Sequence, residues 1–246
     1  MILLIQGNYR NYLGTFKRIP LQLLNGKRQC SANFMITLFS KSLMKFITAG
    51  FCLATTPVLA QDSSFIKVQF IYGSKPLKKH QATEKKWFGG LSGGHVGIEA
   101  DSNKVLDFHH YKSFHVFTSN NNRHSRFLLR PTDEFWSGFH CPGETVKKAT
   151  VIIPVTKAQK QRYDSIANSY LSSSPYDYAF IGMRCAAATY DILSQIGVVE
   201  RYPLKTMYLK IFYPKKLRTR LYAKAKENGW AVIKQEGSSK RKWEQD

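Results

Sequence analysis

Acidic residues are scarce in this sequence, and the first sixty residues contain none. The chain of 246 residues carries 37 Lys and Arg against 16 Asp and Glu, which gives a formal net charge of +21. Seven of the basic residues lie before position 61, so residues 61–246 retain a net charge near +14. Such an excess attracts anionic partners, among them lipid headgroups, acidic wall polymers and nucleic acid, and charge alone does not choose among them.

Apolar runs long enough to cross a bilayer, which takes about 20 residues, are also missing. The nearest candidate extends from Phe46 to Ala60, follows Met44-Lys45 and ends in Val-Leu-Ala. A basic start, roughly 7–15 apolar residues and a small-residue cleavage site are typical of a secretory signal. We therefore predict a signal peptide at 44–60 and a secreted or periplasmic protein, with 1–43 as an untranslated or disordered extension.

Cysteine is rare as well. Only Cys141 and Cys185 follow the predicted signal peptide. An oxidising compartment favours a disulfide between two such cysteines. That disulfide would leave Cys185 chemically silent, so a Cys141–Cys185 pairing is the main alternative to a catalytic cysteine.

The common signatures of metal and nucleotide sites are absent. The sequence has no His-Glu-x-x-His motif and no paired-cysteine spacing, which are typical of zinc sites, and no glycine-rich phosphate loop. His95, Glu99, His109 and His110 lie close together in the chain but match neither zinc signature. We therefore expect no metal and no cofactor.

Residues 61–246 have the usual size of one domain. Runs rich in β-branched and aromatic residues predict four strands, at 65–72, 95–100, 105–109 and 149–155. The turn-forming residues 101–104 should join the second and third strands into a β-hairpin. Two further strand-like runs, at 230–234 and 241–243, are expected to pair with each other around a Gly-Ser-Ser turn.

Three helices are predicted after the hairpin. Thr156 and Gln159 have the spacing of a capping box, which predicts a helix from residue 157. Residues 185–196 form a second helix, apolar almost all round and therefore buried. The basic segment 214–227 begins with a proline suited to a first helical turn. We expect it to pack its leucines on the domain and show its charges to solvent, with an anionic membrane surface as the alternative.

Two residues suggest thiol chemistry. Cys185 lies where its helix begins, and the positive end of a helix with a nearby imidazole lowers the pKa of a thiol and makes it nucleophilic. His95 opens a strand on which Val96 and Ile98 should face the core while the histidine faces the other way. Gly97 leaves room beside His95 for another group. A buried structural cysteine is the competing interpretation of Cys185.

These motifs resemble those of the circularly permuted papain-like proteins of the NlpC superfamily, especially the YiiX type, and more distantly lecithin:retinol acyltransferase. The segment Gly93-Gly-His-Val-Gly-Ile98 is similar to the family's histidine hairpin, and Pro175-Tyr-Asp-Tyr178 with Arg184-Cys-Ala-Ala is similar to its nucleophile segment. The resemblance covers about residues 65–197. It implies an α+β, circularly permuted papain-like fold, in which an antiparallel sheet carrying the histidine packs on a buried helix that starts at the cysteine.

The resemblance also implies a third polar residue twelve positions after the histidine, which is Asp107 here. An aspartate there could orient the imidazole and stabilise its charged form. Hairpin register bears on this independently, because residues directly opposite each other share a face. A four-residue turn would place His110 on the His95 face, whereas a three-residue or five-residue turn would place Asp107 and His109 there. We predict Asp107, with His109 and His110 as alternatives.

Together these features predict an exported thiol hydrolase or acyltransferase, with Cys185 as nucleophile, His95 as base and Asp107 as the third residue. Its substrate would be an amide or ester of the cell envelope, such as a peptidoglycan peptide or a lipid. The amide of Cys185 could hold the developing oxyanion. Tyr176 or Tyr178 could add a further donor.

Two other functions remain open. One is a catalytically inactive papain-like domain, held by the Cys141–Cys185 disulfide, that binds an anionic envelope partner. The other is an exported basic protein that binds nucleic acid, which charge and aromatic content favour but no recognised motif supports. We expect an anionic cell-envelope component as the partner, no nucleic acid, and a monomer.

Overall fold

The computed structural model describes residues 64–84, 93–100, 102–121, 123–138 and 144–246, and all of them belong to one unit, Thr56–Asp246. The protein is α+β: the described residues form a mostly antiparallel sheet and five α-helices. The predicted signal peptide, the N-terminal extension and Cys141 lie outside the described residues. Within the described ranges, no helix is long and apolar enough to span a membrane.

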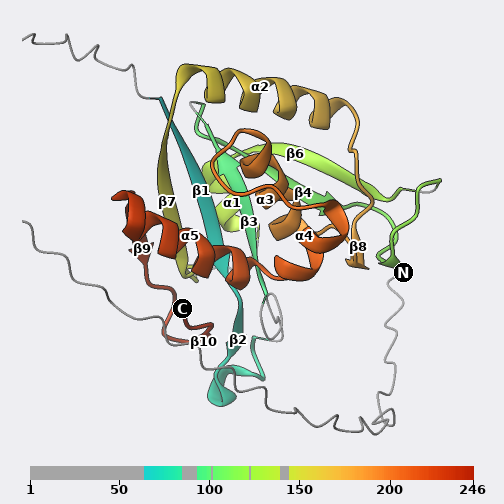
Figure 1. Cartoon of the computed structure of the whole chain (residues 1–246). Helices are drawn as coiled ribbons and strands as arrows, with labels where there is room; N and C mark the ends of the chain where they lie inside the picture. The colour runs from blue at the N-terminus through green and yellow to red at the C-terminus, as the bar shows by residue number, and fades with distance from the viewer. Residues whose placement is uncertain (1–63, 85–92, 101, 122, 139–143) are drawn as a thin grey trace, which may run out of the picture. The chain divides into compact units, whose positions relative to one another are not determined.

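Six strands form the main sheet in the order β6-β4-β3-β1-β7-β9, and every neighbouring pair is antiparallel. In that order they are Ser125–Pro131, Lys104–His110, Gly94–Glu99, Ser64–Tyr72, Lys148–Val155 and Ala231–Gln235 (Figure 1). The four strands predicted from β-branched and aromatic runs are β1, β3, β4 and β7, and those predictions are confirmed.

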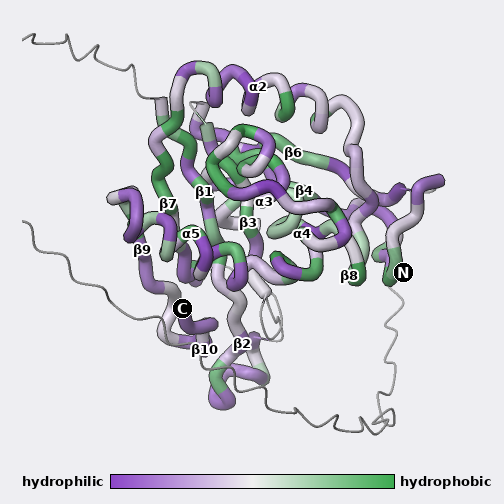
Figure 2. The backbone as a smooth tube through the Cα atoms, in the orientation of Figure 1, coloured by the Kyte–Doolittle hydropathy of each residue, from purple (hydrophilic) through white to green (hydrophobic). Residues whose placement is uncertain are grey.

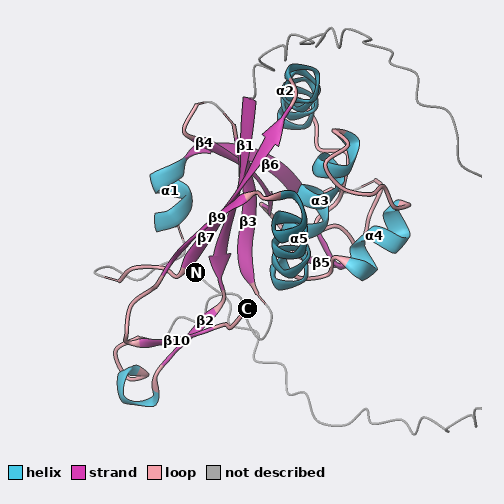
Figure 3. Ribbon diagram, turned by 60° about the vertical axis from the view of Figure 1, so that its left-hand side comes forward, coloured by secondary structure: helices cyan, strands magenta, loops and turns pink. Residues whose placement is uncertain are grey.

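Helices cover the two faces of the main sheet unequally (Figure 3). α2 (Lys157–Ser172), α3 (Cys185–Gln195) and α5 (Pro214–Asn228) contact one face, and α4 (Leu204–Lys210) packs against α3. The short helix α1 (Thr132–Ser137) contacts β4 and β6 on the other side. We call these the α3 face and the α1 face.

Strand β3 shows how the alternation of side chains separates the two faces. Val96 and Ile98 are fully buried in the same apolar cluster as α3. The ring of His95 instead lies 5.6 Å from the ring of Phe135, which belongs to α1. A Cβ on Gly97 would collide with Val105 on the neighbouring strand, so only glycine fits between β3 and β4 here. The predicted orientation of this strand is therefore confirmed.

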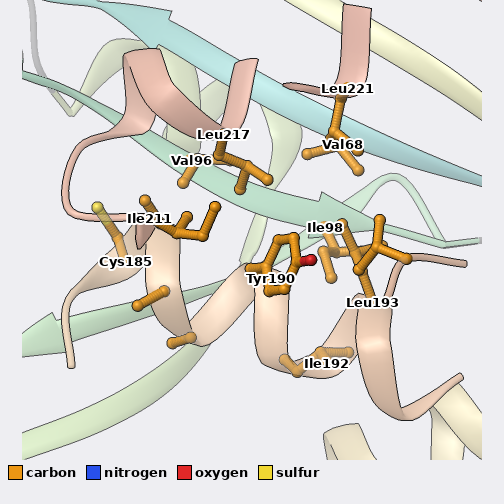
Figure 4. Close-up of a cluster of buried hydrophobic side chains, with 14 of the residues drawn as sticks. Val68, Val96, Ile98, Cys185, Tyr190, Ile192, Leu193, Ile211, Leu217 and Leu221 are labelled. Carbon is orange, nitrogen blue, oxygen red and sulfur yellow. The ribbon is translucent and has the colours of Figure 1, made fainter. Parts of the chain in front are cut away.

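The core lies between the main sheet and the helices of the α3 face. Ten of the eleven residues of α3 are buried, which confirms the prediction that this helix is enclosed. Its small side chains Ala186 to Ala188 allow a close approach to the sheet, and each larger side chain such as Leu193 contributes about 1.5–3 kcal/mol by burial. Figure 4 shows this cluster with Cys185 at one end. Figure 2 shows hydrophobic residues along β7 and mainly hydrophilic ones along α5.

Helix ends follow local chemistry. Thr156 caps α2 as predicted: its Oγ1 accepts from Gln159 N at 3.2 Å, and Gln159 Oε1 accepts from Thr156 N at 2.9 Å. α3 and α5 are followed by Gly197 and Gly229 with φ of 76° and 68°, the left-handed region that favours glycine.

The prediction that the two C-terminal strands pair with each other is wrong. β9 adds to the edge of the main sheet beside β7, whereas β10 (Arg241–Trp243) pairs with β2 (Ser74–Pro76). The open edge of β7 offers unpaired backbone groups that β9 satisfies. Trp243 packs on Gly237 so closely that a Cβ there would lie 2.4 Å from its ring.

The basic helix α5 packs its leucines on the domain, as expected, but one of its charged side chains, Arg218, is not exposed to solvent. Leu217 and Leu221 are fully buried. Arg218 is buried as well: its guanidinium lies 3.7 Å from the centre of the Tyr72 ring and 3.3 Å from a carboxylate oxygen of Glu244. The ring and the carboxylate replace the water that an arginine normally requires.

A second, parallel pair of short strands was not predicted. β5 (His115–Phe117) and β8 (Ala179–Ile181) lie side by side just before α3. Asp177 ties the loop around β5 to this region, because its carboxylate accepts from Ser119 N at 2.8 Å and from His124 N at 3.0 Å and lies 2.5 Å from His115 Nδ1. These contacts join segments more than fifty residues apart.

Candidate active site

Cys185 is the first residue of α3 and carries a free thiol that is 4% exposed. Burial raises the pKa of this thiol to about 11, and the charge of Arg184 with hydrogen bonds from Tyr178, Ala186 and Val96 offsets only part of that increase. The thiol is therefore protonated at neutral pH. The positive end of the helix is present as predicted, but burial outweighs it.

Arg184 holds the start of α3 in place. Its guanidinium lies 3.6 Å from the centre of the Phe212 ring and donates a hydrogen bond to the Phe212 carbonyl. It also lies 5.4 Å from the centre of the Phe180 ring. The residue before the cysteine is thus clamped between the β8 region and the turn that precedes α5.

His95 and Asp107 form a buried pair on the α1 face. Gly97 lies opposite Asp107 and Glu99 opposite Val105. This is the register expected for a five-residue turn between β3 and β4, and it places Asp107 on the same face as His95. His95 Nε2 donates to Asp107 Oδ2 at 2.7 Å. Because this donation uses Nε2–H, a neutral His95 carries its basic lone pair on Nδ1.

Asp107 is the centre of a larger polar cluster. His109 also donates to Asp107 Oδ2 through Nε2. Arg130 Nη2 donates to the same oxygen at 2.5 Å and lies 3.1 Å from His109 Nε2. Within the described part of the chain, Asp107 Oδ1 has no hydrogen-bond partner.

The two ionisable groups of the pair respond to burial in different ways. Burial lowers the pKa of His95 to about 4, although the hydrogen bond to Asp107 opposes this shift. Burial raises the pKa of Asp107, but hydrogen bonds from His109 and His95 outweigh it and hold the pKa well below its usual range. At neutral pH the pair is a neutral imidazole beside a carboxylate.

Cys185 and His95 belong to different faces of the main sheet. The cysteine belongs to the apolar cluster of the α3 face, whereas the histidine lies on the α1 face. Asp107 and His109, in contrast, are brought directly to His95.

A backbone contact nevertheless places the sulfur beside the histidine. Pairing between β3 and β4 ends at Gly97 and Asp107. The N–H of Val96 interacts with the sulfur of Cys185, and this amide nitrogen is bonded to the carbonyl carbon of His95. The sulfur therefore lies at the edge of β3, one peptide away from the side chain it would need.

Of the remaining candidate residues, one contacts the thiol of Cys185 and two lie away from both reactive groups. Tyr178 contacts the thiol of Cys185, and burial raises the pKa of its hydroxyl well above the ordinary value. Tyr176 lies elsewhere, with its hydroxyl donating to Asp191. His110 contacts the rings of Phe114 and Tyr178 and lies outside the cluster around Asp107.

One group of side chains in the described structure has the spacing of a metal site. The donor atoms of His95, Asp107 and His109 all lie within 4.8 Å of one another. Arg130 places a permanent positive charge 2.5 Å from the carboxylate, where a cation would need to bind. Glu99 binds Lys67 and Gln69 instead. The donor set is therefore a poor fit for a metal ion.

Sequence reasoning missed Arg130 and the clamp made by Arg184. Arg130 lies opposite Val105 on β6, and its alternation with Leu129 could have placed it on the His95 face once that strand was recognised. In the sequence, the apolar run at 127–129 is too short to identify this strand. The Arg184 clamp depends on the turn between α4 and α5, for which no local signal was available.

The fold and the site define a class: an α+β protein with a buried cysteine at the start of a helix and a histidine–aspartate pair on the adjoining strands. The chain matches no protein-family model, no curated protein and no solved structure.

Proposed function

We propose that this protein is an exported thiol hydrolase or acyltransferase with a circularly permuted papain-like arrangement, acting on an amide or ester of the cell envelope. One observation carries the proposal. The sulfur of Cys185, at a helix start, interacts with the N–H of Val96, and the preceding residue, His95, is paired with Asp107 at 2.7 Å. These contacts support a site in which the proposed nucleophile lies one peptide from the proposed base, and the base is held by a carboxylate of the neighbouring strand β4.

The chemistry starts from neutral partners. Because the pKa of Cys185 is about 11 and that of His95 about 4, no thiolate–imidazolium ion pair is present at rest. His95 Nδ1 takes the thiol proton as the sulfur attacks the acyl carbon, and Asp107 stabilises the imidazolium that forms. His95 then gives that proton to the leaving amine or alcohol.

The second half of the cycle releases the acyl group. Water or an acceptor alcohol or amine loses a proton to His95 as it attacks the thioester carbon, the C–S bond breaks, and the proton returns to the sulfur. The N–H groups of Ala186 and Val96, which interact with the sulfur at rest, would donate to the oxyanion once the sulfur has attacked. The step requires the sulfur and Nδ1 to lie within hydrogen-bonding distance of each other, beside the Val96 amide that interacts with the sulfur.

The test is a burst experiment with p-nitrophenyl acetate. Wild type should release a burst of p-nitrophenol and carry an acetyl group on Cys185, identified by mass spectrometry of the peptide. Cys185→Ala should show no burst, and His95→Gln should slow it about 100-fold or more. An acetyl group on Cys185 that forms at the same rate in His95→Gln would contradict the proposed pair.

A second candidate is the catalytically inactive binding domain. It is favoured by the separation of Cys185 and His95 on opposite faces and by the raised pKa of the thiol. In that case wild type and Cys185→Ala would show the same slow ester hydrolysis, and no acetyl group would be found on the cysteine. The predicted Cys141–Cys185 disulfide is not formed in this structure, because the thiol of Cys185 is free; Cys141 itself lies outside the described residues.

A further inference from the structure

Exposed apolar side chains lie on both sides of the small β5–β8 sheet: Phe117 and Ile181 share one side, and alternation along the strands places Val116 and Phe180 on the other. Five side chains there are between 39% and 67% exposed, and we call them the apolar patch: Phe114, Val116, Phe117, Phe180 and Ile181. β5 and β8 are only three residues long each, with Phe117 opposite Ile181. Water contact with so many large apolar groups is costly, and clusters of this kind mark binding surfaces.

A basic cavity adjoins the apolar patch. It has a volume of about 400 Å³ and lies between α4 and α5. Its lining residues include four cations and no acidic residue: Lys210, Ile211, Tyr213, Lys215, Lys216, Thr219, Arg220 and Ala223. Such a cavity suits a phosphate-bearing group with some apolar surface.

Aromatic contacts connect the patch to the cavity. The rings of Phe180 and Phe212 lie 5.5 Å apart, and those of Phe212 and Tyr213 lie 4.6 Å apart. Phe180 belongs to the patch and Tyr213 lines the cavity. In Figure 1, β8 and α4 accordingly lie next to each other. Arg184, directly before Cys185, lies against all three of these rings.

The helix α5 cannot itself lie on a membrane through its apolar side, because Leu217 and Leu221 are fully buried in the core. Its cationic edge faces the cavity through Lys215 and Lys216, and through Arg220, whose guanidinium also donates to Tyr202 and lies 3.8 Å from Glu200. The apolar contribution must therefore come from the patch.

We infer that this combined surface docks on an anionic lipid bilayer, with the apolar patch inserted among the headgroups and acyl chains and the basic cavity on a lipid phosphate. Charge complementarity identifies the occupant: exposed aromatic and aliphatic groups beside cations match the interface of an anionic membrane. The inference does not depend on the thiol chemistry. It would place the start of α3 at the membrane surface.

The test uses the full chain with vesicles of phosphatidylcholine and phosphatidylglycerol in equal parts, and with phosphatidylcholine alone. Sedimentation should show binding to the anionic vesicles. Phe117→Ser with Phe180→Ser should weaken that binding about tenfold or more, and so should Lys215→Ala with Lys216→Ala and Arg220→Ala.

Matched control variants distinguish docking through this surface from a general attraction of the basic protein to anionic vesicles. Phe65→Ser removes an exposed aromatic residue from β1, and Lys75→Ala with Lys78→Ala and Lys79→Ala removes the same charge elsewhere. Both controls should bind anionic vesicles as wild type does. Equal weakening by the two cationic triple variants would overturn the inference.

A fluorescent reporter gives a direct readout. Phe117→Trp should show a blue shift of its emission with anionic vesicles and none with phosphatidylcholine alone. Absence of that shift would refute insertion of the patch. So would a wild-type dimer that Phe117→Ser with Phe180→Ser converts to a monomer, because a second copy of the chain would then cover the surface.

Discussion

The two faces of strand β3 place the two halves of the candidate site in opposite surroundings. On the α3 face, Cys185 lies among apolar side chains, and burial raises the pKa of its thiol to about 11. On the α1 face, His95 lies in a cluster with Asp107, His109 and Arg130. Both reactive groups are neutral at pH 7.

The comparison shows that burial has a larger effect than the helix start on the pKa of the Cys185 thiol, so the thiol is protonated at rest. It also shows that the carboxylate of Asp107 does not make His95 cationic, because burial lowers the pKa of His95 more than the hydrogen bond raises it. The proposed activity therefore depends on contact between the sulfur and the imidazole at the edge of β3, where pairing with β4 has ended. The predictions below test how separate the two faces are.

The largest effect is expected for Asp107→Ala. Asp107 is 1% exposed, and its loss leaves the partly buried guanidinium of Arg130 without its carboxylate partner, so the free energy of unfolding should fall by about 3–5 kcal/mol. Urea denaturation followed by circular dichroism measures this. Asp164→Ala is the matched control: it breaks a pair with Lys160 whose carboxylate is 49% exposed, and should cost under about 0.5 kcal/mol. Similar losses in both variants would contradict the buried cluster.

The next effect is on the pH dependence of stability. His95 has a pKa of about 4 in the folded protein and 6.5 as its ordinary value. The unfolded chain therefore binds more protons between pH 4 and 6.5, and the free energy of unfolding rises with pH across that window by roughly 3 kcal/mol. His95→Gln should remove this rise, whereas His80→Gln, on a short surface helix, should keep it. An unchanged slope in His95→Gln would show that the imidazole is not buried in solution.

A third prediction concerns the thiol alone. Labelling of Cys185 with iodoacetamide should have its midpoint near pH 11 and be slow at neutral pH, because the thiolate is the reactive form. Mass spectrometry of the labelled peptide identifies the site. A midpoint well below 8.5 that rises in His95→Gln would show that the two faces already communicate without substrate.

The smallest effect is expected for Tyr178→Phe. Its hydroxyl donates to the sulfur and lowers the pKa of Cys185 slightly against the effect of burial. Removing that donor should raise the labelling midpoint further and leave the fold intact, because the ring still packs against Phe108. Tyr176→Phe is the control, since its hydroxyl donates to Asp191 and not to the thiol. A midpoint that falls in Tyr178→Phe would contradict this role.

The sequence predicted the strands and helices whose signals are local and strong. The capping box at Thr156, the apolar helix from Cys185 and the alternation along β3 all led to the observed elements. The possible turn lengths of the β3–β4 hairpin left Asp107, His109 and His110 as candidate partners of His95. The observed register places Asp107 and His109 beside it. The short elements α1, α4, β5 and β8 were missed because each is too brief to show a period.

The amino-acid sequence by itself determined the basic charge, the buried helix beginning at Cys185 and the strand that carries His95, because composition, periodicity and capping act over a few neighbouring residues. Only the tertiary structure decided which face each reactive group occupies relative to the other, which strand β9 joins, and that Arg130 enters the cluster around Asp107. Those outcomes depend on packing and desolvation between segments far apart in the chain, and no local pattern encodes them.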